Sequence, residues 1–230
     1  MFTGMDKVKY IPLKSNTGIA HATNIGIKQT NEPYILTMDQ DSTVSKELID
    51  SYISFLEMND SDEIGALTPQ YDTDRNHVGK VKGWENVLLS MQSGTLIKRS
   101  TFDNIGLFKE ELFLDVVDWE FFLRMNQANL KLIKVNSAIL KHQPAITQSI
   151  SFGPLELKYG VASPIRYYYQ ARNLLWTAKK YKNPKLYLIL VVKLFKIMIL
   201  FDNKKKYLRA FNKGIRDAKH NKLGKCANML

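Results

Sequence analysis

The sequence has little cysteine and no long apolar run. A single cysteine, Cys226, excludes an internal disulfide and favours a reducing location. No segment near the N-terminus joins a basic region to an apolar run, so no signal peptide is predicted. The longest apolar stretch, Leu186 to Phe201, is interrupted by Lys193 and Lys196. It is shorter than the roughly 20 residues that a bilayer-spanning helix needs. These absences predict a cytoplasmic chain.

The positive charge is confined to the C-terminal part of the chain. Residues 1–178 contain 18 Lys and Arg and 20 Asp and Glu, whereas residues 179–230 contain 15 and 2. Such asymmetry is typical of a tail that binds phospholipid or nucleic acid, although a basic tail can also be merely solvated. A neutral body and an apolar stretch favour a membrane over nucleic acid. We therefore expect no nucleic-acid partner.

Strand and helix patterns alternate through most of the chain. Val8–Leu13 reads as a strand, the turn after it opens a helix at Ile19–Gln29, and the apolar run Tyr34–Met38 indicates a buried strand. The pattern predicts an α/β fold with a mixed, mostly parallel sheet. The later elements expected are a helix at Ser45–Met58, a strand from Ile64 to Pro69, a strand within Leu88–Lys98, helices at Thr101–Ile105 and Asp118–Asn129, and a strand at Leu132–Leu140.

Helices are expected after Ser163-Pro164, because a serine cap followed by proline is a strong helix start. The last of them has an apolar face opposite a basic one, which predicts a helix lying in a membrane interface. Residues 186–225 are thus expected to contact an anionic membrane surface. The apolar face consists of Tyr207, Leu208, Phe211, Ile215 and Ala218.

Two acids follow the Tyr34–Met38 strand in the sequence Asp39-Gln40-Asp41-Ser42. The carboxyl end of a strand is where open α/β sheets bind ligands. Carboxylates placed there suit Mg²⁺ or Mn²⁺, which would neutralise a departing nucleoside diphosphate. The same residues could instead form a solvated turn that caps the next helix. The spacing alone leaves both readings open.

A second acidic group begins the helix at Asp118. Asp118 and Glu120 lie among large apolar residues, and Arg124 follows on the same helix. A partly shielded carboxylate at a helix N-terminus can take a proton from a sugar hydroxyl. Capping of the helix by Asp118 is the alternative, and the two roles are compatible.

Several segments together resemble the rhamnosyltransferase-like branch of glycosyltransferase family 2, over about Lys9 to Asn173. That resemblance implies an inverting enzyme with a Rossmann-like nucleotide-diphospho-sugar transferase fold followed by C-terminal helices. The segments are Asn16–Ile27, Asp39–Ser42, Ser93–Ile97, Ile105–Glu110, Asp118–Glu120 with Arg124, Lys141-His142, Arg166–Tyr168 and Arg172-Asn173.

The resemblance implies roles for individual residues. Asp118 would be the general base, with Glu120 as the reserve, since Val117 stands where the family has the first acid of a Glu-Asp pair. The metal, Mg²⁺ or Mn²⁺, would be bound by Asp41 and Asp39, with Asp41 the main ligand and Asp39 also near the ribose and diphosphate. His142 would complete the metal or diphosphate surroundings. The donor-binding set would be Asn16, Gly18, Asn24, Asp39, Ser93, Gly94, Arg124 and Arg172.

The same resemblance implies the substrates and the location. The donor would be a nucleotide sugar, dTDP-rhamnose by analogy with the branch, and the acceptor a saccharide or lipid-linked saccharide in cell-surface polysaccharide assembly. The enzyme would work at the inner face of the cell membrane. Residues 1–160 would form the catalytic domain and residues 161–230 a basic, amphipathic helical region.

The chain departs from the family at its start, where two further strand–helix units and an Asp-Asn-x-Ser strand end are usual. Their absence predicts that the Ile35–Met38 strand lacks a neighbour, which would leave backbone groups unpaired. A second chain or a homo-oligomer could complete the sheet. The alternative function that follows is a non-catalytic, membrane-associated interaction protein.

Overall fold

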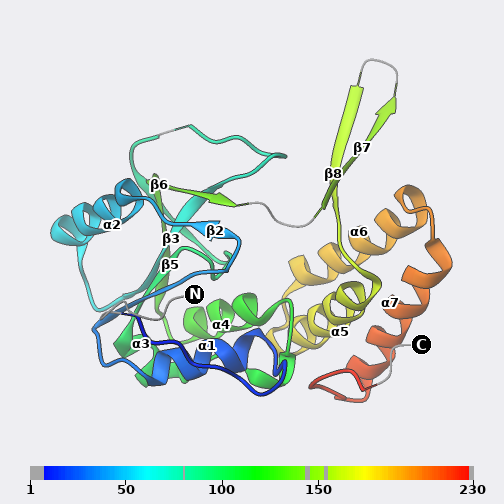
Figure 1. The fold of residues 1–230 in the computed structure, drawn as a ribbon, viewed down its shortest axis with the longest axis horizontal. Coiled ribbons are helices and arrows are strands. Elements are labelled where there is room, and N and C mark those ends of the chain that lie inside the picture. Colours follow the sequence, from blue (N-terminus) through cyan, green and yellow to red (C-terminus); the bar gives the residue numbers. More distant parts are fainter. Residues whose placement is uncertain (1–7, 80, 143–145, 153–154, 228–230) are drawn as a thin grey trace.

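The computed structural model describes residues 8–79, 81–142, 146–152 and 155–227. Strands and helices alternate before three consecutive helices, as Figure 1 shows, and the predicted α/β class is confirmed. The elements are α1 (Ile19–Lys28), β1 (Tyr34–Thr37), β2 (Ser42–Thr43), α2 (Lys46–Asn59), β3 (Ile64–Asp72), β4 (Trp84–Val87), β5 (Thr95–Lys98), α3 (Arg99–Ile105), the 3-10 helix η1 (Glu110–Leu112), α4 (Val117–Gln127), β6 (Lys131–His142), β7 (Ile146–Phe152), β8 (Leu155–Val161), α5 (Pro164–Tyr181), α6 (Pro184–Leu200) and α7 (Lys204–Lys219).

A six-stranded sheet forms the centre of the first 142 residues. Its order is β1-β5-β3-β6-β2, and β4 pairs with β6 as well. The β3–β6 pair is parallel, whereas the β1–β5, β3–β5, β2–β6 and β4–β6 pairs are antiparallel. The sheet is therefore mixed, as expected, but holds less parallel pairing than the sequence predicted. An apolar run indicates a buried strand without giving the direction of its neighbours.

Helices cover both faces of this sheet (Figure 1). Adjacent residues of a strand point to opposite faces. Leu67 of β3 therefore packs in the core that α2 closes, while the neighbouring Ala66 packs in the core beneath α1, α3 and α4. This three-layer arrangement buries the strands and leaves the loops at their ends free to build a site.

The three C-terminal helices pack beside the sheet domain. The apolar side of α7 lies on α5, where Ala210, Phe211 and Ala218 are buried. Gly214 permits this close approach, because a Cβ there would lie 2.4 Å from the Tyr168 carbonyl oxygen. The α7 face predicted to meet a membrane is thus covered by protein instead. Among the described helices, none combines the length and the apolar character needed to cross a membrane.

Other sequence expectations differ at the edges of the fold. Residues 8–13 belong to no strand, and only the end of the Leu88–Lys98 segment pairs, as β5. The β7–β8 hairpin, which projects from the molecule in Figure 1, was not foreseen. On the edge of β1 away from β5, the described residues supply no strand. The domain division after residue 160 stays a prediction.

Candidate active site

Two neighbouring cavities lie at the end of β1. The first has a volume of about 290 Å³. The second, of about 770 Å³, lies between α1 and β1. Both cavities are lined by Ile19, Asp39, Asp41, Gln92, Leu114 and Arg166. The first also reaches Asp115, Asp118, His142, Gln170 and Lys193. Acids from two distant parts of the sequence therefore surround one space.

Asp39 is fixed by Ser93, a member of the predicted donor-binding set, and by the neighbouring Gln92. The backbone N–H of Asp39 donates to Ser93 Oγ at 3.1 Å, and Gln92 Nε2 donates to Asp39 Oδ1 at 3.3 Å. Gly94 donates its N–H to the carbonyl of Thr37 at 2.8 Å. Its φ of +75° puts the backbone in a region that favours glycine. The Ser93-Gly94 turn thus holds the end of β1 and aims Asp39 at the cavity.

Asp41 lies beside His142 because β2 pairs with β6. Ser42 is opposite His142 in that ladder, and Ser42 Oγ lies 2.9 Å from His142 Nδ1. Asp41 Oδ1 is 3.9 Å from the same nitrogen. Asp41 is more than half exposed, whereas His142 is buried.

The metal prediction has partial support from this geometry. In the described part of the chain, no group of three or more His, Cys, Asp and Glu is gathered closely enough to hold a metal ion. Asp41 and His142 form a pair of suitable ligands, and Gln92 Oε1, in the cavity wall, is buried without a hydrogen-bond partner within the described structure. Oxygen and imidazole ligands of this kind suit a divalent cation whose remaining positions are filled by phosphate. The residues thus fit a cation shared with a ligand better than one held by protein alone.

Asp118 lies in the first turn of α4, in the wall of the first cavity. The backbone N–H of Trp119 donates to its Oδ1 at 2.9 Å. Burial, aided by the nearby charge of Asp115, raises the pKa of Asp118 to about 7 despite that hydrogen bond. At neutral pH a substantial fraction of the carboxylate is therefore ionised and able to accept a proton.

A strained loop presents Asp118 to the cavity. Phe113, Asp115 and Val116 all have positive φ angles, of 66°, 60° and 66°. Such angles are unfavourable for these residues and persist only where the surroundings impose them. Asn173 of α5 imposes them here. Its Nδ2 donates to the carbonyls of Leu112, Leu114 and Asp115 at 2.9, 2.8 and 2.9 Å.

Two cations outside the predicted set of site residues enter the same cavity. Arg166 of α5 binds Asp115 at 2.5 Å through Nη2. Lys193 of α6 donates to Gln170 Oε1 at 2.9 Å, and burial lowers the pKa of Lys193. The wall of the first cavity contains four aspartates against these two cations, a formal charge of −2 with all four ionised and His142 neutral. No sequence signal marked Lys193, because it stands in an apolar run.

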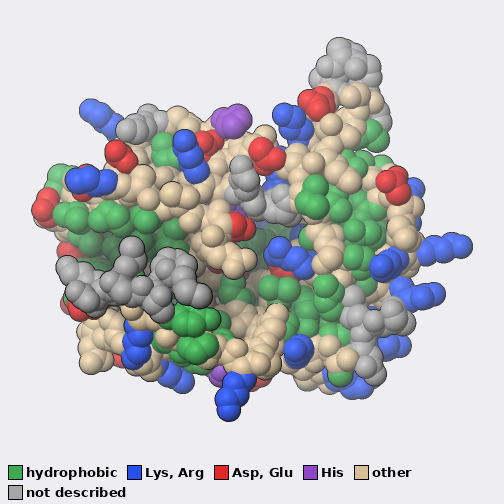
Figure 2. Space-filling model, viewed as in Figure 1, with side chains coloured by type: hydrophobic (Ala, Val, Ile, Leu, Met, Phe, Trp, Pro, Cys, Tyr) green, Lys and Arg blue, Asp and Glu red, His purple; other side chains and the backbone are tan. Residues whose placement is uncertain are grey.

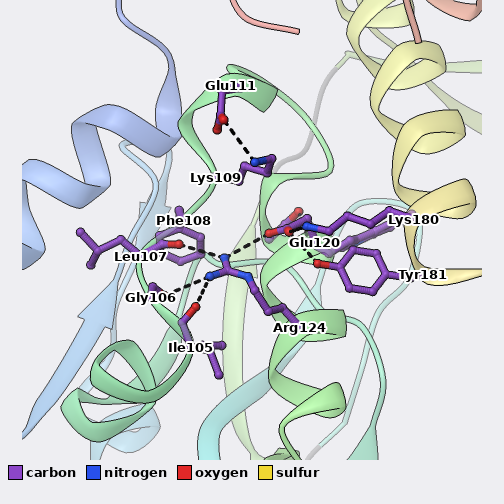
Figure 3. A network of polar contacts seen from close by, with 12 residues as sticks. Ile105, Gly106, Leu107, Phe108, Lys109, Glu111, Glu120, Arg124, Lys180 and Tyr181 are labelled. Carbon is purple, nitrogen blue, oxygen red and sulfur yellow. Dashed lines mark hydrogen bonds and ion pairs between the residues drawn. The ribbon is translucent and has the colours of Figure 1, made fainter. Parts of the chain in front are cut away.

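Glu120 lies in a separate polar network (Figure 3). Its carboxylate is 1% exposed and contacts Arg124 Nη2 at 3.1 Å, Lys180 Nζ at 3.0 Å and the Tyr181 hydroxyl at 2.6 Å. Burial disfavours its charge, but these partners outweigh burial and lower the pKa of Glu120. Glu120 and Arg124 line a different cavity from Asp118. Arg124 also holds the carbonyls of Ile105 and Leu107. Both residues therefore support the fold.

The remaining predicted donor-binding residues also make supporting contacts. Arg172 is buried and donates to the carbonyls of Leu112 and Gly224, at 2.9 and 2.7 Å. Neither Arg172 nor Asn24 lines the two cavities at Asp39. Asn24 binds the backbone of Phe108 in both directions, and Asn16 accepts the N–H of Gly18 at 3.0 Å. A Cβ on Gly18 would lie 2.5 Å from the Phe113 carbonyl oxygen, so this glycine permits α1 to approach the strained loop.

Sequence comparison finds similarity to known glycosyltransferases. Residues 3–113 match the profile of glycosyl transferase family 2. The dTDP-rhamnosyl transferase RfbF of Shigella flexneri is 29% identical over 208 residues, which cover 79% of this chain and 67% of that protein. The profile match covers just under half of the chain, so residues 3–113 are similar to that family. The family match and the rhamnosyltransferase-like relative support glycosyltransferase activity and agree with the predicted resemblance.

Solved structures of glycosyltransferases share the fold. The S. aureus TarS 1–349 structure aligns with a TM-score of 0.51 at 14% identity, covering 91% of this chain and 63% of that one. A GalNAc-T7 structure with UDP, GalNAc and Mn²⁺ aligns with a TM-score of 0.52 at 12% identity, covering 91% and 44%. The chain thus spans less than two thirds of either structure. At these identities the likeness shows the nucleotide-diphospho-sugar transferase fold and no more.

Proposed function

We propose that the chain is an inverting glycosyltransferase that moves rhamnose from dTDP-rhamnose to a hydroxyl of a saccharide or lipid-linked saccharide in cell-surface polysaccharide assembly. The observation that carries this proposal is Asp118, a cavity-lining carboxyl whose pKa is raised to about 7, facing the same space as Asp39 and Asp41. The name of the Shigella flexneri relative supports the choice of donor.

Asp118 acts as the general base in this proposal. Its carboxylate accepts the proton of the acceptor hydroxyl while the hydroxyl oxygen forms a bond to the anomeric carbon of the donor. The bond from that carbon to the diphosphate oxygen breaks on the opposite face, so the configuration inverts and dTDP leaves. A base with a pKa near the working pH is best matched to this task. The hydrogen bonds that Asn173 donates to the preceding loop keep Asp118 in position for this proton transfer.

A divalent cation, Mg²⁺ or Mn²⁺, belongs to the proposal. Asp41 and His142 would hold it together with the donor diphosphate, and Asp39 would lie near the ribose and diphosphate. A cavity with a formal charge of −2 repels a diphosphate, and a bound cation would supply charge neutralisation. The GalNAc-T7 structure, which contains UDP and Mn²⁺, is consistent with such use.

Arg166 and Lys193 would serve the acceptor side. Both lie near Asp115, and Lys193 uses one of its three N–H donors on Gln170 among the described contacts. A desolvated ammonium in a cavity binds phosphate strongly. We assign Lys193 to an anionic group of the acceptor, such as the phosphate of a lipid-linked saccharide. Contact with the inner face of the cell membrane completes the proposed setting.

The experiment that tests the function is a transfer assay with labelled dTDP-rhamnose. The purified chain is incubated with Mn²⁺ or Mg²⁺ and a lipid extract that contains lipid-linked saccharides. The proposal predicts label in the lipid fraction and release of dTDP, with less label from UDP-sugars at equal concentration. Absence of transfer from every donor, with the folded state verified by circular dichroism, would refute it.

A further inference from the structure

Helix α6 has two faces of opposite character. The residues on its inner face are buried or turned toward the protein: Leu186 and Ile197 have no exposed surface, and Lys193 reaches the active-site cavity. Lys196 also turns inward, onto the carbonyl of Gly160. Both lysines that interrupt the apolar run in the sequence therefore lie away from the outer face.

The outer face of α6 is a continuous apolar stripe, named here the α6 stripe. Its side chains are 39% to 65% exposed and recur at helical spacing over about 17 Å, from the rise of 1.5 Å per residue. Contiguous apolar patches of this kind mark interaction sites. The α6 stripe consists of Leu188, Val191, Val192, Phe195, Met198 and Ile199.

Cations stand at both ends of the α6 stripe. Lys182 and Lys185 precede it, and Lys204, Lys205 and Lys206 follow it at the start of α7; all five are exposed. Asp202 is the one exposed acid among the described residues from 179 onward, because Asp217 is buried against Tyr168. In Figure 2, Lys and Arg side chains project along the outer side of the helical half, next to hydrophobic surface.

This charge pattern distinguishes between two partners for the α6 stripe, a second copy of the chain and a lipid bilayer. A second copy docked stripe to stripe would bring the cations of one α6 end against those of the other copy in either orientation, and like charges repel. An anionic bilayer is attracted by both ends and accepts the apolar stripe between them.

We propose that the α6 stripe, and not α7, docks the protein on an anionic phospholipid bilayer. The helix would lie in the interface plane with its outer side chains in the lipid. Because Lys193 on the opposite face enters the cavity, docking would bring the active site within roughly one helix diameter, about 10 Å, of the lipid surface. This last step rests on the proposed function, since it suits a lipid-linked acceptor; the docking itself does not.

Vesicle flotation tests the proposal with the whole chain. Wild type should float with vesicles containing phosphatidylglycerol, less so at high salt, and poorly with phosphatidylcholine alone. The pair Val192→Ser and Phe195→Ser should reduce the bound fraction roughly tenfold, since apolar burial drives interfacial binding. Ile53→Ser with Met58→Ser, at two exposed apolar positions on α2, is the matched control and should bind as wild type does.

A single-residue probe locates the contact. The emission of Phe195→Trp should shift to the blue with phosphatidylglycerol vesicles and be quenched by brominated lipid, whereas that of Met58→Trp should not. The proposal would be overturned if the double variant Val192→Ser with Phe195→Ser bound the vesicles as well as wild type does. It would also be overturned if wild type did not bind them at all. Light scattering that shows a lipid-free dimer, lost in the same double variant, would assign the stripe to a second copy. None of these readouts needs donor or transfer, so they stand apart from the proposed function.

Discussion

Asp41 Oδ1 lies 3.9 Å from His142 Nδ1, although the two residues belong to distant segments of the chain. The short β2–β6 ladder brings them together, since it sets Ser42 opposite His142. The contact joins an exposed carboxylate to a buried imidazole at the cavity that Asp118 also lines.

Asp41→Asn should weaken Mn²⁺-dependent binding of dTDP about tenfold or more, because one carboxylate contact to the cation is lost. Calorimetric titration with and without Mn²⁺ measures this. Asp62→Asn, at an exposed position outside both cavities, is the control and should bind as wild type does. Equal affinity of Asp41→Asn and wild type would remove Asp41 from the metal proposal.

Asn173→Ala should lower kcat at least tenfold while donor binding is kept, since the strained loop loses the three hydrogen bonds that position Asp118. We expect unfolding to become easier by about 2 kcal/mol. Asn183→Ala, which removes the N-cap of α6 and costs about 1 kcal/mol, controls for destabilisation alone. If kcat falls in both variants in proportion to their loss of unfolding free energy, Asn173 has no positioning role.

Glu120→Gln should leave kcat within about twofold of wild type but lower the free energy of unfolding by about 2 kcal/mol, because Arg124 and Lys180 lose a buried partner. Urea unfolding and the transfer assay measure the two effects. A large loss of kcat in a variant that remains folded would return Glu120 to the list of catalytic residues.

Lys193→Met should raise the KM for a lipid-linked acceptor roughly tenfold or more, since a charge-assisted contact in a desolvated site is removed. The affinity for dTDP should change little. Lys196→Met is the control, because it removes the same charge about one helical turn from Lys193 and outside the cavity. Matching acceptor KM values in the two variants would contradict the role given to Lys193.

The sequence was informative where local pattern and chemistry coincide. Asp39 and Asp41 follow an apolar run, and Asp118 begins a helix, so their position at element ends could be predicted. Arg172 could not be interpreted in this way, because a motif does not distinguish an arginine that binds a ligand from one that binds backbone carbonyls. Lys193 was missed since its direction depends on how α6 packs. The antiparallel partners of β5 likewise depend on tertiary contacts.

The raised pKa of Asp118 has consequences for pH dependence. The rate of transfer should rise with pH through about 7 and then level off, as the carboxylate ionises. Its unfolded-state pKa is about 3.9, so the stability it contributes is present below about pH 4 and is lost as pH rises through 7. Asp118→Asn should therefore melt at a higher temperature than wild type at pH 8.

Transfer by Asp118→Asn at saturating dTDP-rhamnose is the most direct test of the proposed mechanism. Calorimetry first establishes that the variant binds dTDP with Mn²⁺ as wild type does. We predict that kcat then falls by about a hundredfold to ten-thousandfold and that the remaining rate no longer changes across pH 7. Transfer at the wild-type rate by a variant that binds the donor normally would contradict the assignment of Asp118 as the base.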